Sequence, residues 1–231
     1  MNKITIAIDG FSSTGKSTVA KQLARALGYV YVDTGAMYRA VTFYAMQNGL
    51  INKDDFNSEA LIYQLPKINI TFKFNEALGF AEVYLNDVNI ENKVRTLEVS
   101  SFVSKVAAVS QVRQKLVEQQ QKMCQDKGVV MDGRDIGTVV FPDAELKLFM
   151  TASAKTRAER RFLELIERGD KVDYEDVLKN VEERDFLDSN RADSPLLKAK
   201  DAIEIDNSHM TLDEQFNKIL QLAKMTIEDC E

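Results

Sequence analysis

Apolar and polar positions follow two different periods along the first fifty residues of the chain. Residues 4–9 alternate as in a short strand, and residues 17–27 repeat apolar positions at the spacing of one helix face. A glycine-bounded loop at 10–15 joins them, and a second strand at 29–32 and a second helix at 36–48 follow. Gly28 and Gly49 stand where left-handed helix caps are favoured. Strands that alternate with helices predict a parallel α/β sheet.

A different pattern occupies the segment 68–92. Apolar residues alternate with polar ones, and the series is partly repeated after Gly79. The alternating residues before that glycine are Ile68, Ile70, Phe72 and Phe74. Two such runs on either side of a turn predict a small antiparallel sheet inserted into a helix-rich core. A long helix is predicted over 96–124, and a glycine at 128 closes its connection.

The rest of the chain returns to strands and helices. Short apolar strands are predicted at 129–131, 146–150 and 202–206, and helices at 154–168, 173–187 and 212–227. Gly169 ends the first of these helices, and the carboxylate of Asp173 is placed to cap the second. We therefore divide the chain into a core in three parts (1–65, 96–152 and 193–231), a β insert (66–95) and a helical lid (153–192).

Length and composition restrict the class of protein. The 231 residues are 45% hydrophobic and 29% charged, which is typical of one large globular domain or of a core with an insertion. The apolar stretches are far shorter than the ~20 residues of a membrane helix. The first predicted strand also lacks the features of a signal peptide. We expect neither export nor membrane insertion.

Charge and the scarce reactive residues exclude further classes. A formal net charge of −6 argues against a general nucleic-acid surface, because a phosphate backbone needs a basic face. Cys124 and Cys230 match no metal or redox spacing, which favours reduced thiols in the cytoplasm over a disulfide between them. The single histidine, His209, is expected at the surface and argues against histidine-based hydrolysis and histidine-ligated zinc.

The loop at 10–17 carries the strongest chemical signal. It fits the pattern G-x-x-x-x-G-K-[ST], in which glycines let the backbone wrap around a phosphate while successive N–H groups point at its oxygens. The positive end of the following helix adds to that field. Lys16 is expected to reach the β- and γ-phosphates, and the Ser17 hydroxyl to bind Mg²⁺. The predicted donor-binding residues are Gly10, Phe11, Ser12, Ser13, Thr14, Gly15, Lys16, Ser17 and Thr18.

The alternative, an ordinary glycine-containing βα turn, is disfavoured by the position of the motif between a strand and a helix. The predicted fold class is therefore α/β, with the core of a P-loop NTPase. A parallel sheet flanked by helices carries a small antiparallel β insert and a helical lid.

Arginine placement indicates what is done with the nucleotide. A GTPase would carry an Asn-Lys-x-Asp motif, and the nearest run, at 52–54, is one residue short. Six of the eleven arginines but only three lysines lie between 155 and 191. The planar guanidinium suits bidentate phosphate contacts, so this bias favours a small kinase over a salt-bridged pair of solvated helices.

Taken together, these residues resemble the bacterial cytidylate kinases of the nucleoside-monophosphate kinase superfamily. The run at 132–143, Asp-Gly-Arg-Asp-Ile-Gly-Thr-Val-Val-Phe-Pro-Asp, is highly specific, and the segments 10–18, 33–39, 106–113 and 183–191 extend the resemblance over essentially the whole chain. The insert near 68–92 resembles that family's enlarged monophosphate-binding region. Departures from the usual pattern are Phe11, Ser13, Thr14 and Thr34, and a serine at 13 in place of glycine restricts the backbone of the loop.

The resemblance implies transfer of the γ-phosphoryl group of ATP to CMP or dCMP, with Mg²⁺ as cofactor and Lys16 as a catalytic residue. Arg39, Arg134 and Arg191 would grip the acceptor phosphate or the transferring phosphoryl group. The lid would close over the triphosphate and exclude water. The other implied contacts are Ser104, Arg113 and Asp135 to the cytosine edge, Arg184 and Asp188 to the ribose hydroxyls, Thr34 and Tyr38 to the acceptor nucleotide, and Arg157 and Arg161, projecting together from the lid, to the donor.

Other hypotheses stay open at this point. UMP is expected to be a weaker acceptor, because uracil replaces the amino donor of cytosine with a carbonyl and leaves Asp135 unmatched. A kinase for another monophosphate or for a small hydroxyl acceptor is the closest alternative. A nucleotide-binding switch would instead show slow hydrolysis and a large exposed apolar patch. We expect a cytoplasmic monomer without nucleic-acid or membrane partners.

Overall fold

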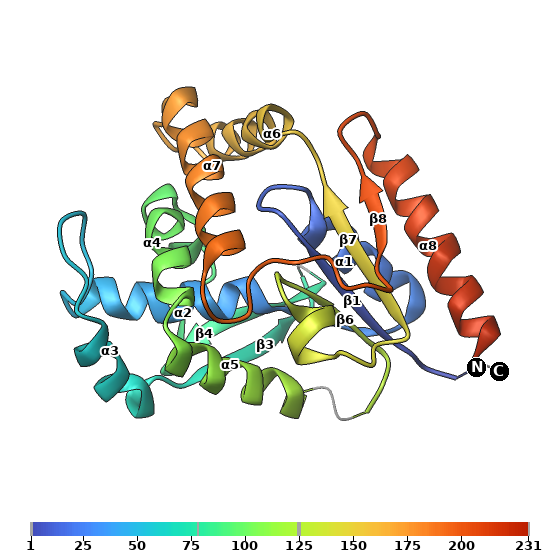
Figure 1. Cartoon of the computed structure of the whole chain (residues 1–231), viewed down its shortest axis with the longest axis horizontal. Helices are drawn as coiled ribbons and strands as arrows, with labels where there is room; N and C mark the ends of the chain where they lie inside the picture. The colour runs from blue at the N-terminus through green and yellow to red at the C-terminus, as the bar shows by residue number, and fades with distance from the viewer. Residues whose placement is uncertain (1, 78, 124–125, 231) are drawn as a thin grey trace.

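A five-stranded sheet forms the centre of the molecule (Figure 1). The computed structural model describes residues 2–77, 79–123 and 126–230. Each strand pairing in this sheet is parallel, as the alternation of strands and helices predicted. The strands, in their spatial order, are β2 (Val30–Asp33), β6 (Val129–Asp132), β1 (Thr5–Gly10), β7 (Leu146–Thr151) and β8 (Ile203–Asp206).

Helices and turns cover both faces of the sheet, so the central strand β1 is buried along its whole length. On one face, α1 (Lys16–Leu27) and α8 (Leu212–Asp229) pack against Ile6 and Ile8 of β1. On the other face, Ala7 lies in a cluster with the short π-helical turn η3 (Ile136–Val140). The carboxyl ends of the parallel strands therefore meet at one edge, where the predicted phosphate loop begins.

The insert predicted at 68–92 is a three-stranded antiparallel sheet made of β3 (Ile70–Asn75), β4 (Phe80–Leu85) and β5 (Val88–Asn89). Ile70 pairs with Leu85, and both side chains are buried in a second apolar core around α2 (Thr34–Gln47). The hydrophobic pattern did not predict the short elements α3 (Ser58–Gln64), Leu65–Lys67 and Lys93–Arg95, because three to seven residues establish no periodicity.

The single helix predicted over 96–124 is wrong, because the chain breaks into α4 (Leu97–Ala107) and α5 (Ser110–Met123). The guanidinium of Arg113, on the first turns of α5, donates to the carbonyl oxygen of Ala107 at 3.2 Å. It thereby satisfies a carbonyl at the carboxyl end of α4, which a continuous helix would have paired internally. Cys124 lies outside the described residues, and Cys230 is a free thiol.

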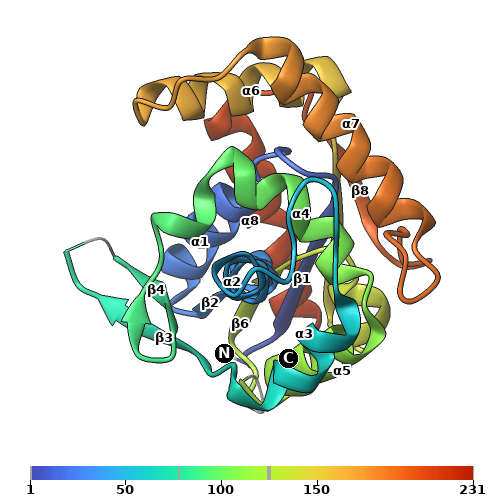
Figure 2. The ribbon, with the colours of Figure 1, turned by 90° about the vertical axis from the view of Figure 1, so that its left-hand side faces the viewer.

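Helices α6 (Ala154–Glu167) and α7 (Tyr174–Asn190) pack on each other and cross above the rest of the molecule (Figure 2). As predicted, the Asp173 side chain caps α7, accepting from the backbone N–H of Glu175 at 2.8 Å. The α7 helix continues three residues past its predicted end at 187, to Asn190. These two helices form the segment predicted as the lid.

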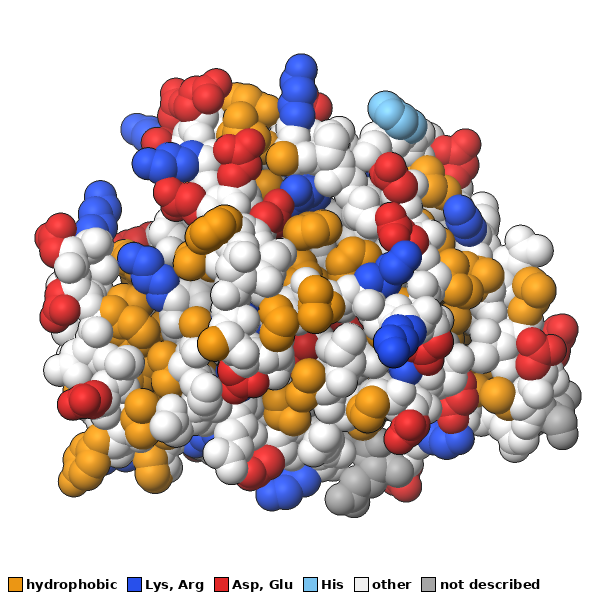
Figure 3. All heavy atoms as spheres, in the orientation of Figure 1, with side chains coloured by type: hydrophobic (Ala, Val, Ile, Leu, Met, Phe, Trp, Pro, Cys, Tyr) orange, Lys and Arg blue, Asp and Glu red, His pale blue; other side chains and the backbone are white. Residues whose placement is uncertain are grey.

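The surface agrees with the composition. In the part of the chain that the structure describes, no helix is both long and apolar enough to cross a membrane. Acidic and basic side chains are interspersed on the face drawn in Figure 3, so charge of one sign is not gathered there. His209 is exposed, as predicted.

Candidate active site

The loop between β1 and α1 is shaped by two glycines and one strained serine. Gly10 has a φ of 140°, and a Cβ there would lie 2.0 Å from the carbonyl oxygen of Met150 on β7, so only glycine fits. Gly15 (φ 85°) turns the chain into α1. Ser13 has a φ of 58°, in the left-handed region, which costs a residue with a side chain about 1 kcal/mol or more. The restriction expected at position 13 is present as backbone strain.

The ammonium group of Lys16 is buried inside this loop. Its Nζ donates to the carbonyl oxygens of Gly10 (2.9 Å) and Phe11 and to Oγ1 of Thr14 (3.3 Å). Burial, and then the charge of Arg134, lowers the pKa of Lys16. The loop therefore holds a desolvated cation at the amino end of a helix, which is an environment that favours an anionic ligand.

Ser17 and Asp132 bring two hard oxygen ligands together at the edge of the sheet. Ser17 Oγ donates to Asp132 Oδ2, and the Tyr31 hydroxyl donates to Asp132 Oδ1, both at 2.8 Å. Among the described residues, no group of three or more His, Cys, Asp or Glu side chains could hold a metal ion by itself. A serine hydroxyl beside one carboxylate nevertheless fits Mg²⁺, which keeps several waters and takes its other ligands from substrate phosphates.

A cavity of about 720 Å³ opens in front of the loop. Its walls come from the loop, α2, α4, the segment after β6, and the two lid helices. The structure thus brings together residues that lie far apart in the sequence. The predicted site residues that line the cavity are Ser12, Ser13, Thr14, Gly15, Lys16, Ser17, Thr18, Thr34, Tyr38, Arg39, Ser104, Arg113, Arg134, Asp135, Arg161, Arg184, Asp188 and Arg191.

Guanidinium groups that repel one another line the middle of the cavity. Arg39 donates to the carbonyl oxygen of Val94 at 3.3 Å, and Arg184 to Oγ of Ser100 at 3.1 Å. Burial, followed by the charge of Arg134, lowers the pKa of Arg184 to about 10. Burial, followed by the charge of Arg184, also lowers the pKa of Arg39. Such a cluster destabilises the ligand-free protein and favours binding of a multiply charged anion.

One carboxylate, Asp188 on α7, connects this cluster to α4. Its Oδ1 accepts from Oγ of Ser104, and its Oδ2 accepts from Nε of Arg134, both at 2.8 Å. Burial disfavours the charge of Asp188, but Arg134 and Arg184 outweigh it, so the pKa of Asp188 lies below its usual value. The side chain of Ser104 is therefore held inside the cavity by a contact across 84 positions of sequence.

At the far end of the cavity, Arg113 and Asp135 form a buried ion pair. Their side chains are 2% and 4% exposed, and Nη2 of Arg191 lies 3.7 Å from Oδ1 of the same carboxylate. Tyr38 places its ring 5.5 Å from the guanidinium carbon of Arg113. Among the described residues, the buried Tyr38 hydroxyl and Arg191 Nη2 have no hydrogen-bond partner. This end of the cavity therefore offers both donors and an acceptor to a polar ligand.

Three predicted site residues do not line the cavity. Gly10 ends β1 against the backbone of Met150, and Phe11 packs edge-on against Phe149 with ring centroids 6.0 Å apart. Arg157 is buried behind the loop, where it donates to the carbonyl oxygen of Ser12 (3.2 Å) and forms two hydrogen bonds with the carboxylate of Asp185. It does not project into the cavity with Arg161, because this ion pair and the ring of Phe11 hold its guanidinium. A contact between Arg157 and the donor stays a prediction.

Arg95 lines the cavity although its sequence context did not mark it as a site residue. Its Nη2 lies 2.7 Å from both Asp33 Oδ2 and Glu91 Oε1, so it joins the start of α2 to the insert. Burial opposes its charge, but these two carboxylates outweigh burial and raise the pKa of Arg95. A signal was present, because Arg95 is the only arginine between positions 39 and 113. The other lining residues without a predicted role include Lys21, Asp33, Glu91, Arg160 and Arg168.

The backbone carbonyl of Arg95 also connects the insert to the lid. It accepts from Nη2 of Arg161 at 2.6 Å and from Nη1 of Arg168 at 2.8 Å. Arg161 on α6 and Arg168 at its carboxyl end therefore contact the last residue of the insert. The described structure has the lid in contact with the opposite wall of the cavity.

Comparison with known proteins gives a consistent result. A sequence model of the family described as cytidylate kinase matches residues 6–225. The cytidylate kinase of Flavobacterium johnsoniae is 68% identical over 99% of both chains, and that of Flavobacterium psychrophilum is 67% identical over 96% of this chain and 99% of its own. Among solved structures, an uncharacterized protein from Eubacterium ventriosum aligns over 97% of this chain and 99% of its own with a TM-score of 0.50 at 13% identity, which supports the fold alone. The chain belongs to the cytidylate kinase family.

Proposed function

We propose that this nucleoside-monophosphate kinase transfers the γ-phosphoryl group of ATP to CMP or dCMP and releases CDP or dCDP and ADP. The observation that carries the proposal is the group of mutually repelling arginines between the phosphate loop and the Arg113–Asp135 pair. Two anions that repel each other in water would be drawn together there, because the surrounding charge is positive and part of it is unneutralised.

The donor end is formed by the phosphate loop. Lys16 would exchange its contacts with loop carbonyls for the β- and γ-phosphates, and the backbone N–H groups of residues 10–18 would bind their oxygens. Mg²⁺ would be held by the Ser17 hydroxyl and phosphate oxygens, with Asp132 near its water shell, and would neutralise charge on the triphosphate. Arg161, and after a change of partner Arg157, would contact the donor from the lid.

The acceptor end is divided between phosphate, ribose and base. Arg39, Arg134 and Arg191 would hold the monophosphate, with Thr34 and Tyr38 beside them. Arg184 and Asp188 would hold the ribose hydroxyls. The carboxylate of Asp135 would accept from the cytosine amino group, while Arg113 and Ser104 would donate to its carbonyl oxygen and ring nitrogen.

The proposed reaction needs no catalytic base. The second phosphate pKa of a nucleoside monophosphate is near ~6, so at neutral pH the acceptor is mostly a dianion with a competent nucleophilic oxygen. The barrier lies in bringing that dianion to the triphosphate. The site lowers this barrier by positioning the two substrates and by neutralising their negative charge. The single histidine of this chain, exposed and away from the cavity lining, has no role in this scheme.

Closure of the lid would complete the site. The segment 153–192 would come down over the triphosphate and exclude water, which would otherwise accept the phosphoryl group. The proposal also includes a cytoplasmic monomer that binds small-molecule substrates and no nucleic acid.

A coupled assay of ADP release with CMP, dCMP, UMP, AMP and GMP tests the proposal. We expect CMP and dCMP to be the preferred acceptors, with UMP weaker and the purine monophosphates poorer still. ADP release at the same slow rate with and without each acceptor would favour a nucleotide switch instead. Preference for AMP or GMP would contradict the assignment of the base site.

A further inference from the structure

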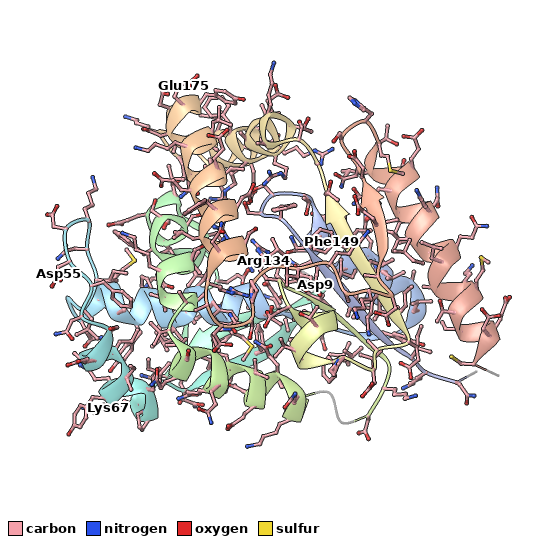
Figure 4. All side chains as sticks on the ribbon, in the orientation of Figure 1. Asp9, Asp55, Lys67, Arg134, Phe149 and Glu175 are labelled. Carbon is pink, nitrogen blue, oxygen red and sulfur yellow. The ribbon has the colours of Figure 1, made fainter. Side chains whose placement is uncertain are left out.

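Asp9 is a buried carboxylate that the proposed reaction does not use. It lies on β1 directly before Gly10 of the phosphate loop, and it is only 4% exposed. Its Oδ1 accepts from the backbone N–H of Ile136 at 2.8 Å, and its Oδ2 accepts from that of Gly137 at 2.7 Å. Figure 4 shows Asp9 in the centre of the molecule, close to the segment that carries Arg134.

These two bonds hold the start of η3, the turn that follows the acceptor-binding residues Arg134 and Asp135. The first N–H groups of a helical turn have no partner within the turn, and here a side chain from another strand supplies both acceptors. Helix α2 packs closely on this segment. A Cβ on Gly133 would lie 2.7 Å from Oγ1 of Thr34, which donates to the carbonyl oxygen of Asp132 at 2.7 Å.

A carboxylate is the group best suited to this position. Two N–H donors that converge on one side chain need two acceptor oxygens, and their bonds to an ionised group are stronger than bonds between neutral groups. Burial raises the pKa of Asp9 to about 6, while the two backbone N–H groups act in the opposite direction. A buried charge of this kind destabilises the fold, so its presence suggests a role in positioning the segment that it binds.

We propose that Asp9 is a positioning residue that fixes Arg134 and Asp135 relative to the phosphate loop. The inference rests on the proposed function, in which those residues bind the acceptor. Asp9 is joined by a peptide bond to the first glycine of the donor-binding loop, and its carboxylate binds the two amides directly after Asp135. The Asp9 side chain therefore joins the donor-binding loop to the segment after Asp135, next to the backbone bond from the N–H of Gly133 to the carbonyl oxygen of Ile8 (3.0 Å).

The Asp9→Asn variant tests this role. An asparagine has one acceptor oxygen for two N–H donors, and its own amide would face one of them, so the start of η3 would shift. A displacement of about 1 Å at the reacting groups costs on the order of 100-fold in rate. We expect kcat/KM for CMP to fall ~10- to 100-fold, and the ratio of CMP to UMP use to fall with it. Affinity for a non-hydrolysable ATP analogue, measured by calorimetry, should stay within about 3-fold.

Asp206→Asn is the matched control. Asp206 is the last residue of a parallel strand, β8, and like Asp9 its carboxylate accepts two hydrogen bonds, here both at Oδ1, from N (2.9 Å) and Oγ (2.6 Å) of Ser208. It does not line the cavity. This variant should match the wild-type protein in CMP kinetics and in binding of the ATP analogue.

Three outcomes would overturn the inference. The first is that Asp9→Asn leaves both the CMP kinetics and the CMP-to-UMP ratio unchanged. The second is that Asp9→Asn weakens binding of the ATP analogue as much as it lowers CMP use. The third is that Asp206→Asn has the same effect as Asp9→Asn. If Asp9→Asn does not fold, Asp9→Glu replaces it, since glutamate keeps the charge and both acceptors but moves them by one methylene. Selective loss of CMP use is again expected, and unchanged use would refute positioning. A wild-type protein without activity on CMP would instead contradict the proposed function.

Discussion

Arg184→Met is expected to make the ligand-free protein more stable while removing most of its activity. Burial and the nearby charge of Arg134 lower the pKa of Arg184 from the usual value of an arginine to about 10. One pKa unit corresponds to about 1.4 kcal/mol, so the charged guanidinium costs the folded state on the order of 3 kcal/mol. Methionine keeps much of the aliphatic volume without the charge. Loss of the hydrogen bond to Ser100 removes ~1 kcal/mol, which leaves a net gain of about 2 kcal/mol.

The sign of this effect follows from the two protonation equilibria. The pKa of Arg184 is lower in the folded protein than in the unfolded chain, so the unfolded chain binds the proton more tightly. The penalty is therefore complete at every pH well below about 10, and it fades only as the pH rises above that value. The gain from Arg184→Met should be the same at neutral and at mildly acidic pH.

Thermal melting without nucleotide measures the gain. For a chain of this length, about 2 kcal/mol corresponds to a rise in Tm of ~4–8 °C. The control is Arg25→Met, which removes an exposed arginine from the end of α1 and should change the free energy of unfolding by less than ~0.5 kcal/mol. In the coupled assay, kcat/KM for CMP should fall by about 100-fold, since the charge-assisted hydrogen bonds that we propose between Arg184 and the ribose would be lost. An Arg184→Met protein less stable than wild type would refute the argument that like charges strain the cavity.

Four further predictions concern other parts of the structure. Ser13→Gly should raise the free energy of unfolding by about 1 kcal/mol in denaturant titrations, because glycine adopts the φ of 58° without strain. Ser13→Ala should give no such gain, and equal effects of the two substitutions would contradict backbone strain at this position. Asp135→Ala should lower CMP use far more than ATP binding, and equal loss of both would argue against base recognition by Asp135. The same variant should destabilise the protein by about 3–5 kcal/mol, because Arg113 is left buried and unpaired. Hydrogen exchange should slow in residues 153–192 when a bisubstrate analogue binds, and equal exchange with and without it would exclude lid closure. The stability of the wild-type protein relative to Asp9→Asn should fall by about 3 kcal/mol between pH 3 and 8, because the pKa of Asp9 is raised from 3.8 to about 6 and its protonated form favours the folded state. A pH-independent difference would show that Asp9 does not titrate in this range.

The amino-acid sequence was enough to predict the strand–loop–helix unit at the start of the chain, the alternation that produces a parallel sheet, and the antiparallel insert. These features depend on residues that are neighbours in sequence. Gly10 and Gly15 permit the backbone angles of the phosphate loop, and alternating apolar residues give β3 and β4 one buried face. Local chemistry and periodicity contain that information, so it could be recovered without tertiary contacts.

Which polar side chains meet depends on how distant elements of the chain pack together. Arg157 and Arg161 are one helical turn apart, yet Asp185 holds the first behind the loop while the second faces the cavity. A segment with a continuous helical pattern is divided into α4 and α5, and Arg113 of α5 donates to the carbonyl oxygen of the last residue of α4. Asp9 contacts two amides that are more than 120 positions away. Hydrophobic periodicity indicates whether a position is buried, but it does not identify the partner of a buried charge. A buried charge is stable only where a suitable partner lies within hydrogen-bond distance, and the packing of distant elements determines which residue that is.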